Sequence, residues 1–165
     1  LGDVYKRQTP SCPSAPERPL NVGPPLWLGR IGPRCHSGAV RLLIVEDERA
    51  MAEALRRGLS AEGFVVEVAI DGPAGLEAAR FGGYDAVVLD VMLPGLDGFA
   101  LTRHVRSHPR AKDIAIIMVT SADDRLKEAA TEAGVTLVLG KPYEEAALLA
   151  CIEQAQTVHP APLPV

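Results

Sequence analysis

The chain has 165 residues and a formal net charge of −4, enough for one domain of ordinary size with a buried core. Its charge is uneven, since residues 1–39 carry +3 and residues 40–165 carry −7, so the acidic part is not expected to bind nucleic acid by itself. No apolar stretch approaches the roughly 20 residues of a membrane span, and three cysteines without metal-ligand spacing favour a reduced, cytoplasmic protein.

The first 39 residues differ in composition from the rest. They hold seven of the fourteen prolines and no periodic apolar pattern, which predicts a disordered leader. The chain begins at Leu1 and not at Met, and Val40 directly precedes an apolar run, so we expect translation to start at Val40; a native disordered leader is the alternative. Three prolines in residues 157–165 predict a disordered tail, which leaves one domain over residues 40–156.

Short apolar runs alternate with helix-length segments along this domain. Met51, Leu55 and Leu59 recur at helical spacing, Gly63 suits a helix C-cap, and Asp71 suits an N-cap. The expected strands span 42–45, 64–69, 85–90, 114–120 and 135–139, and helices follow them, among them 48–61, 124–133 and 144–155.

Five strands that alternate with five helices predict a doubly wound α/β domain, a flavodoxin-like (βα)5 sandwich. The four runs that lead into acidic, hydroxyl or lysine residues read as fully buried parallel strands, because they are continuous and rich in β-branched residues. The order most often built from five such units is 2-1-3-4-5, whose switch point lies between the first and third strands.

Residues suited to phosphate chemistry stand at the strand ends. Glu46 and Asp47 follow the first strand, Asp90 ends the third, Thr120 the fourth, and Lys141 follows the fifth. Three converging carboxylates repel one another, and Mg²⁺ is the natural cation to join them, although acids at strand ends can also be simply solvated.

With the metal bound, Asp90 could attack phosphorus and form an acyl phosphate, while Lys141 and Thr120 neutralise the transferring group. A cis bond before Pro142 would turn the lysine toward this site.

Four segments together resemble the receiver domain of bacterial two-component response regulators. They are Val45-Glu46-Asp47-Glu48, Leu89 to Gly98, Thr120-Ser121-Ala122 and Lys141-Pro142-Tyr143, and the resemblance covers residues 40 to about 156. It implies that Asp90 is the phosphoacceptor of a phosphorelay, supplied by a histidine kinase or a histidine phosphotransfer protein. It also implies that Glu46, Asp47, Asp90 and the main-chain carbonyl of Met92 hold Mg²⁺, and that Thr120 and Lys141 bind the phosphoryl group and report its arrival.

Two features depart from the family pattern. Val138 stands three positions before the lysine, where the family has an aromatic switch residue, so the signal must be communicated differently or more weakly. The acidic pair and the last-helix arginine of the transcription-factor subgroup are also absent, which argues against the usual phosphorylation-dependent dimer. The apolar residues there favour a buried fifth strand, with a different interface as the alternative.

Rival functions fit the residues less well. A haloacid-dehalogenase-like phosphatase needs a second aspartate at Met92, and a phosphate loop needs Ser or Thr at Pro142. We therefore expect a signalling module that docks on an unknown downstream protein, and not an enzyme. A fragment of a larger transcription factor and a receiver that is never phosphorylated remain open, and His104 and His108 are expected to be solvated.

Overall fold

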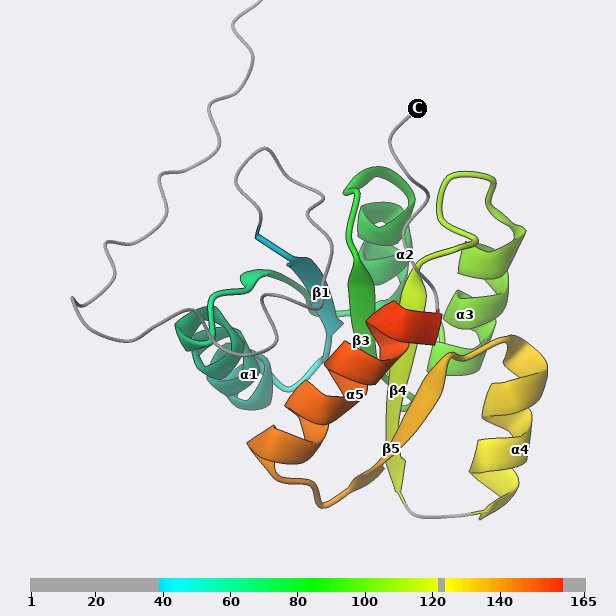
Figure 1. Ribbon diagram of the computed structural model, residues 1–165. Helices are drawn as coiled ribbons and strands as arrows, with labels where there is room; N and C mark the ends of the chain where they lie inside the picture. Colours follow the sequence, from blue (N-terminus) through cyan, green and yellow to red (C-terminus); the bar gives the residue numbers. More distant parts are fainter. Residues whose placement is uncertain (1–38, 122–123, 159–165) are drawn as a thin grey trace, which may run out of the picture.

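The computed structural model describes residues 39–121 and 124–158 (Figure 1). Five strands alternate with five helices, as predicted. The elements are β1 Arg41–Val45, α1 Arg49–Ala61, β2 Val65–Ala69, α2 Gly72–Phe81, β3 Ala86–Asp90, α3 Gly98–Ser107, β4 Ala115–Ser121, α4 Asp124–Ala133, β5 Leu137–Lys141 and α5 Glu145–Val158. The predicted leader, apart from Ala39, and the tail beyond Val158 lie outside the described residues.

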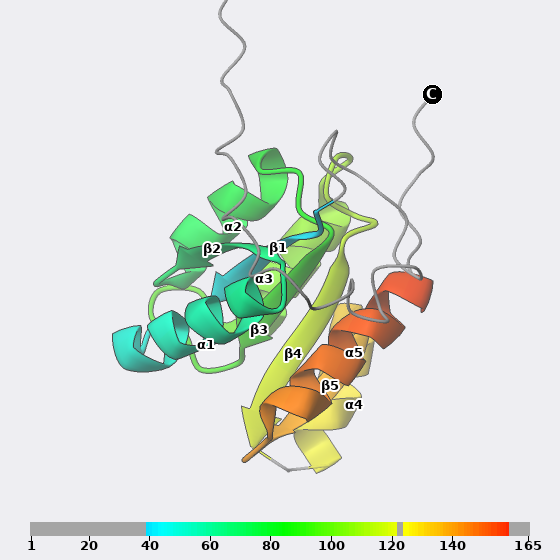
Figure 2. The same ribbon diagram turned by 60° about the vertical axis from the view of Figure 1, so that its left-hand side comes forward.

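The five strands form one parallel sheet in the order β2-β1-β3-β4-β5, which confirms the predicted fold and strand order. Both views show the strands running the same way, so their carboxyl ends share one edge of the sheet (Figures 1 and 2). Asp90 at the end of β3 pairs with Val119, and Ser121 at the end of β4 pairs with Lys141. This register gathers the candidate site residues at that edge.

Helices cover both faces of the sheet (Figure 2). Alternate residues of the strands point to opposite faces: Leu43 and Val45 pack with residues of α2, α3 and α4, whereas Leu42 and Ile44 pack with residues of α1 and α5. Each fully buried leucine or isoleucine contributes about 1.5–3 kcal/mol of hydrophobic stabilisation. The two cores together hold β1 and β3, the strands that carry the acidic residues, in fixed positions.

Local sequence signals explain where the helices begin and end. The side chains of Asp71 and Asp97 accept hydrogen bonds from the main-chain N–H groups of the third helical residues, and so cap α2, as expected, and α3. Gly63 and Gly134 have φ angles of 95° and 93°, which favour glycine after a helix.

The fifth strand differs from the prediction in extent and in burial. It spans Leu137–Lys141 where residues 135–139 were expected, because Val135 and Thr136 form the turn that follows α4 and are bonded to Ala130 and Ile116. Its first four residues are half-buried, so the expectation of a fully buried strand was wrong for this strand. As an edge strand, β5 has a neighbour on one side only.

One further boundary and one helix position also differ. Helix α5 extends to Val158, two residues into the predicted tail. Met51 fits the helical repeat but is 38% exposed, because Ala52 and Leu59 are the buried residues of α1. Among the described residues, no helix is long and apolar enough to span a membrane.

Candidate functional site

Asp90 occupies the centre of the carboxyl edge. It is the last residue of β3, between β1 and β4, and only 7% of its surface is exposed. Its Oδ1 accepts a hydrogen bond from the Met92 main-chain N–H at 2.9 Å, and its Oδ2 accepts one from the Lys141 ammonium at 2.5 Å. A buried carboxylate thus has a fixed orientation and a cation at one oxygen.

Lys141 reaches this carboxylate from the end of β5, across the end of β4. The peptide bond between Lys141 and Pro142 is cis, the conformation named in the sequence analysis. The side chain of Lys141 is 39% exposed, and the side chain of Asp90 is 9% exposed. Burial lowers the pKa of Lys141, but the hydrogen bond and charge of Asp90, with the charge of Glu46, outweigh burial and raise the pKa above its ordinary value. The lysine is therefore held in its charged form.

Glu46 is the second buried acid of the site, with 6% of its surface exposed. Its main-chain N–H donates to the Ala69 carbonyl, which continues the β1–β2 pairing, and its Oε1 accepts from the Glu48 N–H at 3.1 Å. Burial raises the pKa of Glu46; the charges of Asp90 and Asp47 raise it further, against the opposing effects of the Glu48 amide and Lys141. These couplings bring Glu46, Asp90 and Lys141 into one electrostatic cluster.

The other predicted residues surround this cluster. Thr120 is buried near the end of β4, opposite Gly140 of β5 and one residue before the Ser121–Lys141 pair. Asp47 is exposed just beyond β1, and Met92 is 80% exposed in the loop after β3. The structure therefore places all of the predicted side chains at one edge of the sheet. Ala122 lies outside the described residues.

The acidic residues suit Mg²⁺ in chemistry, although their side chains do not converge as a finished cage. Within residues 39–121 and 124–158, no three His, Cys, Asp or Glu side chains gather closely enough to hold a metal ion. Both oxygens of Asp90 already accept hydrogen bonds, and Asp47 is exposed. The donor set is nevertheless one of carboxylate oxygens, which Mg²⁺ prefers. Burial raises the pKa of Glu46 most, and a cation would relieve the repulsion by Asp90 and Asp47 that adds to this effect.

Sequence reasoning assigned no role to Tyr143. This tyrosine is half-buried, and the charges of Lys141, Glu46 and Asp90 all act on its phenol. Burial is the main cause that raises the pKa of Tyr143. Its position two residues after Lys141 was the available signal. Of the two histidines expected to be solvated, His104 is exposed, whereas His108 is half-buried and packs edge-on against Phe81.

Comparisons with known proteins agree with this geometry. The model of the response regulator receiver domain family matches residues 42–153. The response regulator MprA of Mycobacterium ulcerans is 42% identical over 113 residues, which are 68% of this chain and 48% of that protein. MprA of Mycobacterium sp. (strain KMS) is 43% identical over 112 residues, 67% of this chain and 48% of that protein. The chain thus spans about half the length of the curated relatives it matches.

Solved structures show the same architecture. The chemotaxis response regulator CheY4 of Vibrio cholerae is 27% identical, with a TM-score of 0.68 over 71% of this chain and 98% of that one. The receiver domain of the sensor histidine kinase PA1611 of Pseudomonas aeruginosa is 29% identical, with a TM-score of 0.65 over 70% of this chain and 96% of that one, and has a magnesium ion coordinated in its active site cleft. On its sequence, strand order and site geometry, the chain belongs to the response regulator receiver domain family.

Proposed function

We propose that this domain accepts a phosphoryl group on Asp90 in a histidine-to-aspartate phosphorelay. The observation that carries the proposal is the buried Asp90 carboxylate at the sheet edge, with the Lys141 ammonium 2.5 Å from its Oδ2. An acid held in this way can present an oxygen to phosphorus, and the lysine lies where negative charge gathers during transfer.

In the proposed reaction, a carboxylate oxygen of Asp90 attacks the phosphorus of a phosphohistidine. The new bond joins that oxygen to phosphorus as the phosphorus–nitrogen bond breaks, and the imidazole nitrogen keeps the electron pair. Lys141 and the Thr120 hydroxyl bind the oxygens of the transferred group and so report its arrival. Transfer depends mainly on position and charge, which these rigidly placed strand ends can supply.

The residues that would hold Mg²⁺ are Glu46, Asp47, Asp90 and the main-chain carbonyl of Met92. When bound, the ion supplies positive charge that neutralises the phosphoryl oxygens and the acidic cluster. The raised pKa of Glu46, caused by burial and by the charges of Asp90 and Asp47, supports a cation at this edge.

The donor in this proposal is a histidine kinase or a histidine phosphotransfer protein, and the phosphorylated domain acts in the cytoplasm by docking on a downstream protein. It is a signalling module and not an enzyme. The net charge of −7 over residues 40–165 argues against nucleic-acid binding by this domain alone.

A second candidate is that the domain is the receiver part of a larger response regulator. The relatives named MprA are about twice the length that the chain covers, which favours this candidate. A receiver that is never phosphorylated is less well supported, because the acid, hydroxyl and lysine residues are all present at one edge.

The test is incubation with acetyl phosphate and Mg²⁺, followed by intact mass measurement. The protein should gain one phosphoryl group, and Asp90→Asn should gain none. Asp97→Asn is the matched control, because Asp97 lies on the loop that follows Asp90 and caps α3. Asparagine caps a helix about as well as aspartate, so this variant should stay folded. Labelling of Asp90→Asn equal to that of the control would exclude Asp90 as the acceptor.

A further inference from the structure

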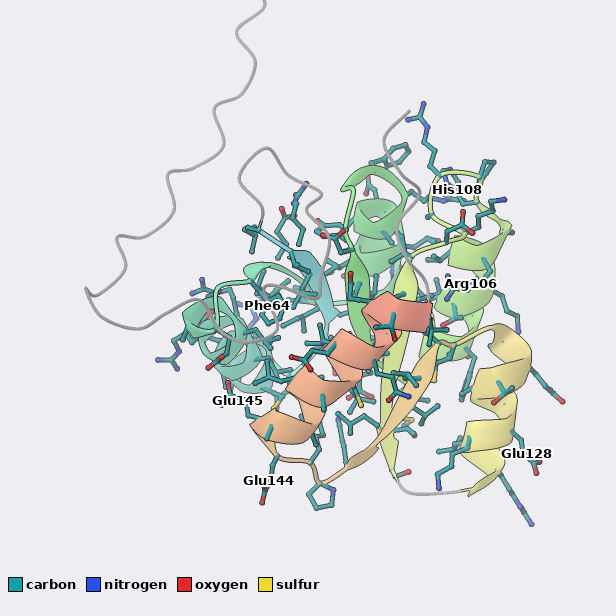
Figure 3. The ribbon with its side chains drawn as sticks, in the orientation of Figure 1. Phe64, Arg106, His108, Glu128, Glu144 and Glu145 are labelled. Carbon is teal, nitrogen blue, oxygen red and sulfur yellow. The ribbon has the colours of Figure 1, made fainter. Side chains whose placement is uncertain are left out.

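An apolar groove of about 550 Å³ lies between α1 and the start of α5. Its walls come from α1 and from the segment that joins β5 to α5. At one side, Glu145 at the start of α5 lies beside α1 (Figure 3). Its Oε1 is so close that a Cβ on Gly58 of α1 would stand 2.5 Å from it. The groove lining also includes Lys141 and Tyr143.

Lys141 belongs to the groove and to the phosphorylation site at once. Its side chain lines the groove, while its ammonium bonds to Oδ2 of Asp90. Anything that moves this ammonium away from Asp90 therefore also changes the groove wall. The two places share a single side chain.

Tyr143 is the next large side chain in that wall. It packs against the core on the α1 and α5 side of the sheet, and its phenol interacts with the charges of Lys141, Glu46 and Asp90. Only Pro142 separates it from Lys141, and the proline ring restricts the backbone between them. A displacement of Lys141 is thus not easily absorbed before Tyr143.

The opposite face of the sheet offers no comparable aromatic group from β5. Val138 packs against the core formed with α2, α3 and α4. Tyr143 is the only Phe, Tyr or Trp in the sequence after Phe99. An aromatic side chain that responds to Asp90 from this part of the chain is therefore on the α1 and α5 side.

We propose that Tyr143 transmits the phosphorylation of Asp90 to the groove between α1 and α5. When a phosphoryl group occupies Asp90, the Lys141 ammonium transfers its contact from Oδ2 to a phosphoryl oxygen, and the Tyr143 ring shifts with it and reshapes the groove. This inference rests on the proposed phosphoacceptor function. It identifies Tyr143 as a positioning residue, which acts through Lys141.

The three methionines of the chain allow a direct test, because each reports a different place. Met92 lies in the loop after Asp90, Met51 lines the groove, and Met118 is fully buried in β4. Beryllium fluoride with Mg²⁺ is the probe, since it occupies a phosphoacceptor carboxylate as a stable mimic of the phosphoryl group. Methyl NMR of ¹³C-methyl-methionine protein is recorded before and after its addition.

In the wild-type chain, the Met92 and Met51 signals should both shift. Tyr143→Leu should keep the Met92 shift and lose most of the Met51 shift, and Tyr143→Phe, which retains the ring, should restore the Met51 shift. An unchanged methyl chemical shift of Met118 in each variant, before the probe is added, shows that the core is intact.

The outcomes separate this inference from the function on which it rests. A Met92 signal that does not respond in the wild-type chain contradicts phosphoacceptance at Asp90, and the inference falls with it. A Met92 shift without a Met51 shift overturns the role of Tyr143 alone. So does a Met51 shift of equal size in Tyr143→Leu. If that variant does not fold, a wild-type Met92 shift without a Met51 shift still overturns the role of Tyr143.

Discussion

The two buried acids of the site are held in different ways. Asp90 has hydrogen-bond donors at both oxygens, one of them a charged lysine, whereas the hydrogen bond that orients Glu46 comes from the Glu48 amide. Asp47 next to them is exposed. The three carboxylates are therefore not equivalent toward a cation that approaches from solvent.

Mg²⁺ affinity should depend more on Asp47 than on Glu46. The exposed carboxylate of Asp47 can enter the coordination shell directly, while buried Glu46 can act through water. We expect Asp47→Ala to weaken Mg²⁺ or Mn²⁺ binding roughly tenfold or more, and Glu46→Gln to weaken it less. Calorimetric or fluorescence titration measures both, and an unchanged dissociation constant for Asp47→Ala would contradict the assignment.

Phosphorylated Asp90 should hydrolyse slowly, with a lifetime longer than seconds in the absence of a phosphatase. Met92 is 80% exposed in the loop after the acceptor, and its thioether is at best a weak acceptor that cannot orient a hydrolytic water. In receiver domains the side chains two residues after the phosphoacceptor and two after the threonine flank the path of the hydrolytic water, and here these are Met92 and Ala122, of which Ala122 lies outside the described residues. A water that no side chain orients attacks the phosphoryl group more slowly, because the reacting atoms are not held in position.

Decay of phospho-Asp90 after removal of the donor, followed by intact mass, checks this lifetime. Met92→Asn should accelerate the loss, as should Ala122→Glu. Decay of the wild-type domain within seconds would refute the prediction.

At the scale of the elements, Arg106 of α3 joins the segment just before β4 to the turn after α4 (Figure 3). Its guanidinium donates to the carbonyls of Gly134, Lys112 and Ile114, and also to the Thr136 hydroxyl. The same hydroxyl accepts from the Ile116 N–H. Burial lowers the pKa of Arg106, while the charge of Asp113 opposes this effect. One side chain thus fixes the turn between α4 and β5 and the start of β4.

Arg106→Ala should lower the free energy of unfolding by about 2–4 kcal/mol, because the partly buried carbonyls of Gly134 and Ile114 lose their donor. Arg103→Ala is the matched control, since Arg103 lies on the same helix and is exposed; its effect should stay within about 0.5 kcal/mol. Urea unfolding followed by circular dichroism compares the two, and equal effects would show that the hydrogen bonds of Arg106 do not anchor these segments.

At the scale of the whole molecule, the surface formed by α4, β5 and α5 lacks the charged pattern of the transcription-factor subgroup. Val135, Thr136 and Leu137 stand where that pattern has acidic residues, and Cys151-Ile152-Glu153 stands in the last helix. Neither Cys151 nor Ile152 carries a charge that a partner could bind. Ile152 is also buried, and Cys151 is half-buried.

We therefore expect phosphorylation not to change the oligomeric state of the domain. Light scattering coupled to size exclusion, with and without beryllium fluoride and Mg²⁺, measures its mass. A mass that doubles on addition of the probe would show that an uncharged interface forms instead, and half-buried β5 would be the first place to seek it.

Much of the fold and of the site could be predicted because the signals are local. Continuous apolar runs define β1, β3 and β4, and Asp71 and Asp97 cap helices through bonds to residues three positions away. Parallel pairing then requires that residues at strand ends meet at one edge, which brought Asp90 and Lys141 together in the prediction as in the structure.

The sequence by itself determined the order of the elements and the chemistry of the sheet edge, since both follow from periodicity and from residue types at strand ends. The strand order followed from the number of βα units, for which 2-1-3-4-5 is the order most often built. Tertiary structure alone decided that β5 is half-buried, that Arg106 binds the turn after α4, and that Tyr143 and Lys141 share a groove with α1. These features depend on side chains from segments far apart in the chain, and no local pattern records which distant carbonyl, charge or helix face a side chain will meet.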